Sequence, residues 1–105
     1  PPRSTLFPYT TLFRSRTVHV RIEGRVQGVG YRAWTDCTAR GLGLAGWVRN
    51  RHDGAVEAVL QGSPESVSEM LRQCERGPAT ARVTRVEIVG EGVGVFDRFE
   101  VRPTA

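Results

Sequence analysis

A glycine-punctuated loop constrains this chain more than any other feature: it reads Gly24-Arg25-Val26-Gln27-Gly28-Val29-Gly30-Tyr31-Arg32. Before it, Val18, Val20 and Ile22 alternate with polar residues, a pattern typical of a half-buried strand. After it, residues 31–42 have apolar residues at near-helical spacing. The sequence therefore predicts a strand that runs into a loop, and a loop that opens a helix.

Such a corner can bind an anion. Successive backbone N–H groups in the loop can converge on one point, and the helix N-terminus adds unpaired N–H groups and partial positive charge. Phosphate fits that geometry best. Arg32 falls in the first turn of the helix, and a guanidinium is permanently charged and can bind two phosphate oxygens at once. The glycine spacing alone matches neither common nucleotide-binding motif, so a plain strand–turn–helix corner explains it as well.

Further stretches give the order of the remaining elements. A strand is predicted over residues 44–51, Asp53-Gly54 predicts a two-residue hairpin turn, and residues 55–61 return as a strand. Ser63 and Pro64 are typical of a helix start, and Gly77-Pro78 stops that helix. A strand over 82–89 follows, with Val83 and, after a shift of phase, Val86 and Ile88 facing the core, and a short strand over 96–102 comes last. The pattern is βαββαβ plus a short strand: an α+β, ferredoxin-like split βαβ sandwich, with an antiparallel sheet and two helices on one face.

Two ordered motifs carry a resemblance to a known family. The loop motif Gly24–Arg32, followed by Gly46-Trp47-Val48-Arg49-Asn50, resembles the signature pair of the acylphosphatases. Agreement extends from about Thr17 to Pro103, including the ending Phe99-Glu100-Val101-Arg102. Tyr31 stands where Phe is more usual, so its hydroxyl needs water or a partner. The resemblance implies the same ferredoxin-like fold.

The resemblance also implies a reaction and the residues that perform it. Acyl phosphates would be hydrolysed to carboxylate and phosphate by direct attack of water, without metal or cofactor. Arg32 and Asn50 are the expected catalytic residues: Arg32 stabilises phosphoryl charge, and Asn50 orients the water, since an amide can accept a hydrogen bond from it. The backbone of the loop is expected to bind the phosphate, through Gln27, Gly28, Val29, Gly30 and Tyr31.

Two other functions are compatible with parts of the sequence. An acylphosphatase-like domain could bind phosphate or carbamoyl phosphate without turnover, as in hydrogenase-maturation carbamoyltransferases, but we expect no second domain after Ala105. A ferredoxin-like RNA-binding module would need exposed aromatic residues on the central strands, and residues 17–23 and 55–61 have none. We therefore expect a small-molecule acyl phosphate as the partner, and neither nucleic acid nor a membrane.

Composition limits the remaining possibilities. The chain has 105 residues, one domain's length, and a net charge of +4 with arginine as its only strongly basic residue. Cys37 and Cys74 belong to no C-x-x-C motif, and a bridge between them requires both thiols to face a common seam between the helices. Residues 1–15 contain no acidic residue and repeat Thr-Leu-Phe, so we expect a disordered, non-native-looking segment, followed by one domain over 16–105. No signal-peptide core is present, so we expect a cytoplasmic protein. Nothing in the sequence requires more than one copy of the chain, so we expect a monomer.

Overall fold

The computed structural model describes residues 15–105, so residues 1–14 of the segment predicted to stand apart lie outside the described residues. The described chain follows the predicted order. Its elements are β1 (Arg16–Arg25), α2 (Tyr31–Gly41), β2 (Ala45–Asn50), β3 (Val56–Gly62), α3 (Pro64–Cys74), β4 (Arg82–Glu91) and β5 (Phe99–Val101). The predicted βαββαβ arrangement with a short final strand is confirmed.

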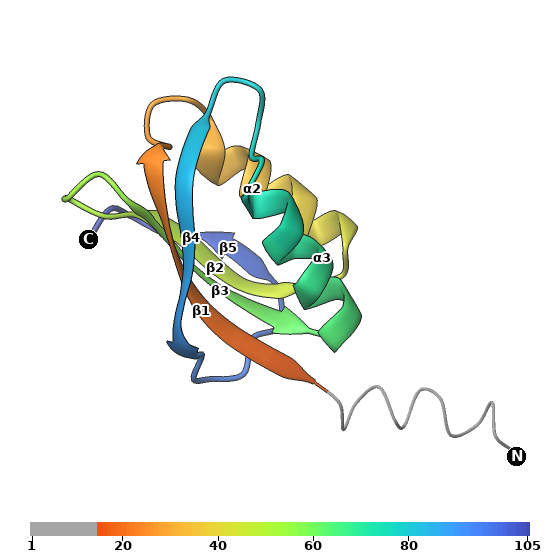
Figure 1. The fold of residues 1–105 in the computed structure, drawn as a ribbon. Helices are drawn as coiled ribbons and strands as arrows, with labels where there is room; N and C mark the ends of the chain where they lie inside the picture. Colours follow the sequence, from red (N-terminus) through yellow and green to blue (C-terminus); the bar gives the residue numbers. More distant parts are fainter. Residues whose placement is uncertain (1–14) are drawn as a thin grey trace, which may run out of the picture.

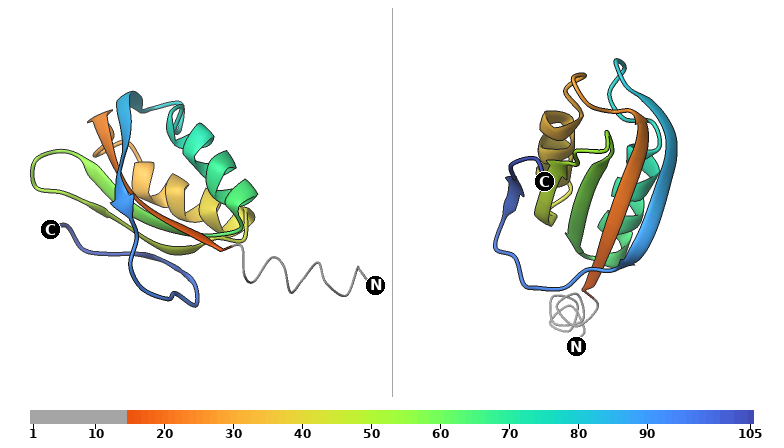
Figure 2. Two further views of the ribbon diagram at one scale, coloured as in Figure 1. Left: turned by 60° about the horizontal axis from the view of Figure 1, so that its bottom comes forward. Right: turned by 90° about the vertical axis from the view of Figure 1, so that its left-hand side faces the viewer.

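In the described part of the chain, the strands form one sheet of order β4-β1-β3-β2-β5. Neighbouring strands among β1 to β4 are antiparallel, as predicted, whereas β5 runs parallel to β2. The sheet is therefore mixed, and the prediction of an antiparallel sheet is wrong for β5. Helices α2 and α3 cover the same face, and the described residues place no helix on the opposite face (Figure 1; Figure 2). None of the described helices has the length and apolar character needed to cross a bilayer.

The register places two distant segments at the same end of the sheet. Asn50, the last residue of β2, pairs with Val56 of β3, and Val56 pairs with Ile22 of β1. The loop after β1 and the hairpin between β2 and β3 therefore leave the sheet at one end. That arrangement brings the two motifs of the sequence together.

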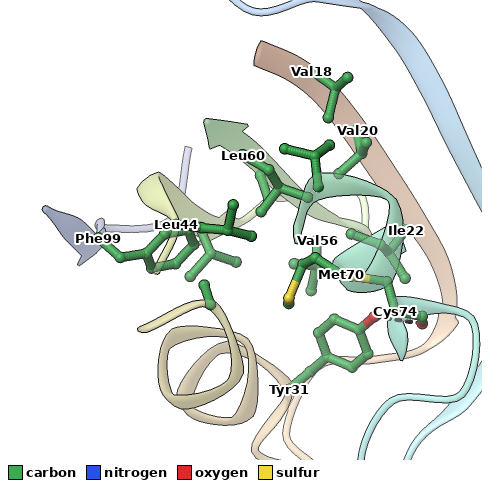
Figure 3. Close-up of a cluster of buried hydrophobic side chains, with 14 of the residues drawn as sticks. Val18, Val20, Ile22, Tyr31, Leu44, Val56, Leu60, Met70, Cys74 and Phe99 are labelled. Carbon is green, nitrogen blue, oxygen red and sulfur yellow. Dashed lines mark hydrogen bonds between the residues drawn. The ribbon is translucent and has the colours of Figure 1, made fainter. Parts of the chain in front are cut away.

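The core lies between the sheet and the two helices (Figure 3). Helix α3 buries Val67, Met70 and Cys74, three members of its apolar stripe, and Leu71 packs beside them. The Ser63 side chain caps this helix by accepting a hydrogen bond from the Ser66 N–H, with Pro64 in the first turn. The predicted helix start at Ser63 and Pro64 is confirmed.

Tyr31 begins α2 and is fully buried at 1 % exposure. Its hydroxyl donates a hydrogen bond of 2.7 Å to the backbone carbonyl of Cys74, at the end of α3 (Figure 3). Burial raises the pKa of the Tyr31 hydroxyl well above its usual range. The hydroxyl that sets this chain apart from the more usual Phe therefore joins the two helices.

Three expectations need correction or completion. The hairpin turn is not a two-residue turn. The Gly54 N–H bonds to the Arg51 carbonyl, and among the described residues only glycines have positive φ. His52, Asp53 and Gly54 therefore form a longer loop.

Ile88 does not enter the core. It is 49 % exposed because it lies on edge strand β4, where little of α3 covers the sheet. Cys37 and Cys74 are both free, since Cys37 is exposed whereas Cys74 is buried.

Candidate active site

The loop between β1 and α2 presents backbone N–H groups without a capping side chain. Gly28 and Gly30 have φ of 74° and 81°, in the left-handed region that glycine adopts without strain. Gly30 is the N-cap of α2, and no side chain bonds the first turn of this helix. The earliest bond within the helix runs from the Trp34 N–H to the Gly30 carbonyl. The N–H groups of residues 31–33 therefore have no partner inside the helix and stay available to an anion.

A cavity of about 300 Å³ opens over this helix end. It brings together Arg32 from α2 and Asn50 from β2, which are 18 positions apart in the sequence. Three of the predicted phosphate-binding residues, Gly28, Gly30 and Tyr31, line it too. The complete lining is Val26, Gly28, Gly30, Tyr31, Arg32, Ala33, Asn50 and Val101.

Arg32 supplies the charge of this cavity, because it alone among the lining residues is ionised. Its side chain is half-buried, and it forms no ion pair or hydrogen bond with any residue of the described chain. By contrast, Arg21 is bound to Glu23 and Asp53, and Arg49 is bound to Glu57. An unpaired guanidinium beside a helix N-terminus favours a doubly charged anion such as a phosphoryl group.

Asn50 supplies an unpartnered acceptor. It is 9 % exposed, and within residues 15–105 its Oδ1 is the buried side-chain oxygen that lacks a hydrogen-bond partner. Leaving such a group unpaired costs about 1–3 kcal/mol, so a water or a ligand is expected to satisfy it. An acceptor at the wall of an anion cavity is suited to holding a water molecule beside the anion.

The other two predicted loop residues, Gln27 and Val29, do not line the cavity. The carbonyl of Val29 accepts a 2.7 Å hydrogen bond from the Thr80 hydroxyl, which ties the loop to the segment before β4. The Gln27 side chain points to the hairpin instead, where its Nε2 donates to the carbonyls of Arg51 and Ala55. These contacts involve the Gln27 side chain and the Val29 carbonyl, so phosphate binding by the two backbone N–H groups stays a prediction.

Several residues that line this cavity were not predicted from the sequence as site residues. The apolar lining residues include Val26, Ala33 and Val101, and Val101 comes from β5, which the chain reaches only after the rest of the sheet. No local pattern marks Val101 as a site residue, because its place depends on the pairing of β5 with β2. Trp47 lies outside the cavity: it packs against the guanidinium groups of Arg49 and Arg102, at 4.7 and 5.0 Å.

A second polar cavity at the same end of the sheet does not compete for this role. It is lined by Arg21, Glu23, Gly24, Asp53, Gly54 and Ala55. Both of its carboxylates bind the same guanidinium, at 2.9 Å for Arg21 with Glu23 and 2.8 Å for Arg21 with Asp53. The Arg21 guanidinium is therefore already paired, and the two carboxylates leave this cavity with a net negative charge that disfavours an anion, whereas Arg32 and Asn50 retain free binding groups.

Fold and site together define a class: a small split βαβ domain with an anion-binding corner and a neutral hydrogen-bond acceptor beside it. The acylphosphatase family model matches residues 18–101. An acylphosphatase of Rhodopseudomonas palustris is 66 % identical over 67 residues, which cover 64 % of this chain and 68 % of that protein. An acylphosphatase of Synechococcus is 51 % identical over 87 residues, covering 83 % of this chain and 93 % of the relative. The chain belongs to the acylphosphatase family.

A solved structure agrees with this assignment. An acylphosphatase from Coxiella burnetii superposes with a TM-score of 0.83 at 33 % identity, covering 88 % of this chain and 97 % of that one. The predicted family and fold are thus confirmed.

Proposed function

We propose that this chain hydrolyses acyl phosphates to a carboxylate and inorganic phosphate, with the cavity around Arg32 and Asn50 as the active site. The observation that carries the proposal is the meeting of an unpaired guanidinium, uncapped helix N–H groups and a buried unpartnered amide oxygen in one cavity. The first two bind the phosphoryl group, and the third binds the attacking water.

The phosphoryl group would sit on the loop, where the N–H groups of residues 27–31 and the guanidinium of Arg32 face its oxygens. These donors are fixed in place before the substrate arrives, so little reorganisation is needed as charge spreads over the oxygens in the transition state. Arg32 takes the part that a metal ion takes in many other phosphoryl-transfer sites, and we propose a metal-independent reaction on that ground.

The Asn50 amide would accept one hydrogen bond from the water and direct its oxygen at phosphorus. A bond forms between the water oxygen and phosphorus, the bond between phosphorus and the acyl oxygen breaks, and the electron pair leaves with the carboxylate. The water's proton passes to a phosphoryl oxygen, so the products are R–COO⁻ and H₂PO₄⁻. An amide is neither acid nor base, and orientation suffices because a carboxylate is a weakly basic leaving group.

The test is release of benzoate and phosphate from benzoyl phosphate in EDTA. Wild-type turnover should survive chelation, and Arg32→Ala and Asn50→Ala should each lower kcat by about 10²–10³-fold. Arg16→Ala is the matched control, since Arg16 starts β1 at the other end of the strand and its side chain bonds only the Ser68 hydroxyl among the described residues. A folded wild type that binds phosphate without turnover would instead support a binding domain.

Compartment and oligomeric state belong to the same proposal. We propose a cytoplasmic monomer, and the two free thiols, one of them exposed, fit a reducing compartment. Light scattering after size-exclusion chromatography should give a monomer mass at micromolar concentration. A dimer mass would refute the proposed monomer and would leave the proposed reaction unaffected.

A further inference from the structure

The side-chain amide of Gln27 joins the two halves of the proposed active site. Its Nε2 donates hydrogen bonds of 2.7 Å to the Arg51 carbonyl and 2.8 Å to the Ala55 carbonyl. Gln27 belongs to the loop that would hold phosphate, and the two carbonyls belong to the hairpin that follows Asn50. In the described part of the chain, no other hydrogen bond joins residues 26–30 to residues 50–55.

The hairpin does not need Gln27 in order to close. The Arg51 N–H donates to the Ala55 carbonyl at 2.8 Å, and the Gly54 N–H donates to the Arg51 carbonyl at 3.1 Å. Each carbonyl that Gln27 binds therefore keeps a second donor when the amide is removed. The fold of the hairpin is thus secured by its own backbone, and what Gln27 adds is the link to the loop.

That link bears directly on Asn50, which precedes Arg51 in the chain. The buried Oδ1 of Asn50 and the N–H groups of the loop lie on different elements, β2 and the start of α2. Orientation of a water toward phosphorus requires a fixed spacing between these two groups, and a misplacement of about 1 Å can cost about 10²-fold in rate. The two hydrogen bonds of the Gln27 amide tie the phosphate loop to the hairpin beside Asn50, and so they constrain that spacing.

We infer that Gln27 is a positioning residue, which holds the Asn50 amide at the distance from the phosphate loop that water attack requires. The inference rests on the proposed function. It predicts that Gln27 acts on kcat through Asn50, while phosphate binding depends on backbone N–H groups and on Arg32, which a change of the Gln27 side chain leaves in place.

The variant that tests this is Gln27→Met, because methionine has nearly the same length and no donor. Its kcat for benzoyl phosphate should fall about 10–100-fold, whereas KM and the inhibition constant of inorganic phosphate should change less than about threefold. Gln61→Met is the matched control: the Gln61 amide also donates two bonds, both of 2.9 Å, to the Thr17 hydroxyl and the Gly94 carbonyl. This control should keep the wild-type kcat.

A double-mutant cycle separates positioning from general support of the fold. In an Asn50→Ala background, Gln27→Met should cause no further loss of kcat, because the group that it positions is gone. A multiplicative loss would overturn the inference, as would an unchanged kcat in Gln27→Met alone. Should Gln27→Met fail to fold, Gln27→Asn replaces it in the cycle, since asparagine is too short to reach both carbonyls. A folded wild type without turnover would overturn the proposed function itself, a different result from an active wild type with an unaffected Gln27→Met.

Discussion

The hydroxyl of Tyr31 should stabilise the fold measurably, although phenylalanine is more usual at this position of the loop motif. It donates to the Cys74 carbonyl at 2.7 Å, from a residue that is 1 % exposed. That carbonyl lies in the last turn of α3, and the residue four positions further is Pro78, which has no N–H to replace the bond. Tyr31→Phe therefore leaves a buried acceptor without its donor.

The expected cost follows from this geometry. An unsatisfied buried acceptor costs about 1–3 kcal/mol, and because Phe keeps the ring packing the net loss should be about 1–2 kcal/mol. For a domain of this size that corresponds to a fall in Tm on the order of 5–10 °C. Urea unfolding followed by tryptophan fluorescence should show a lower midpoint and an unchanged m-value. A free energy of unfolding within about 0.3 kcal/mol of wild type would mean that this hydrogen bond does not stabilise the fold.

The same hydroxyl gives a pH signature. Burial raises the pKa of Tyr31 in the folded state above the value of about 10 in the unfolded chain. Its contribution is therefore fully present below about pH 10 and is lost as the unfolded state ionises above it. The stability difference between wild type and Tyr31→Phe should shrink above about pH 10. A difference that stays constant to about pH 11 would contradict this explanation.

Further predictions concern a cap, a half-buried carboxylate and the anion site. Ser63→Ala should lower the free energy of unfolding by about 1 kcal/mol, because it removes the hydrogen bond that caps α3 at 3.1 Å; thermal unfolding measures it, and Ser68→Ala serves as the control outside the cap. Burial alone would raise the pKa of Glu57, but its bonds with Arg49 and His19 outweigh burial and hold the pKa below its usual range. Stability from this group should therefore be present above about pH 4.5 and lost in more acidic solution, and Glu57→Gln should flatten that acid limb in urea titrations. Inorganic phosphate at about 100 times its Kd should raise the stability of wild type by about 2.7 kcal/mol and leave Arg32→Ala nearly unchanged in calorimetry; equal stabilisation of both would place the anion elsewhere.

The helices and strands of this fold could be predicted because capping residues and the spacing of apolar residues mark each of them within a short stretch of sequence. Ser63-Pro64 marks a helix start by its chemistry, and Val67, Met70 and Cys74 repeat at the period of a helix that buries one face. The same reasoning failed for Ile88, whose alternation correctly predicts a strand but whose burial depends on how far α3 reaches over β4.

The candidate site was predictable only in part. Family resemblance pointed to Arg32 and Asn50, and the register of β1, β3 and β2 explains why two motifs so far apart meet. The contacts that connect the site to the rest of the molecule were beyond sequence reasoning. The bonds of Tyr31 to Cys74 and of Gln27 to the hairpin join residues 43 and 24–28 positions apart, so no periodicity or turn rule reports them.

In the proposed mechanism a water molecule attacks phosphorus in this cavity, and hydrolysis in ¹⁸O-labelled water distinguishes that attack from attack at the carbonyl carbon. Benzoyl phosphate is hydrolysed by the wild-type protein in EDTA, and the products are measured by ³¹P NMR and mass spectrometry. We predict one labelled oxygen in the phosphate and none in the benzoate. Label in the benzoate would mean that water attacks the carbonyl carbon, and it would contradict the proposed roles of the phosphate loop, Arg32 and Asn50.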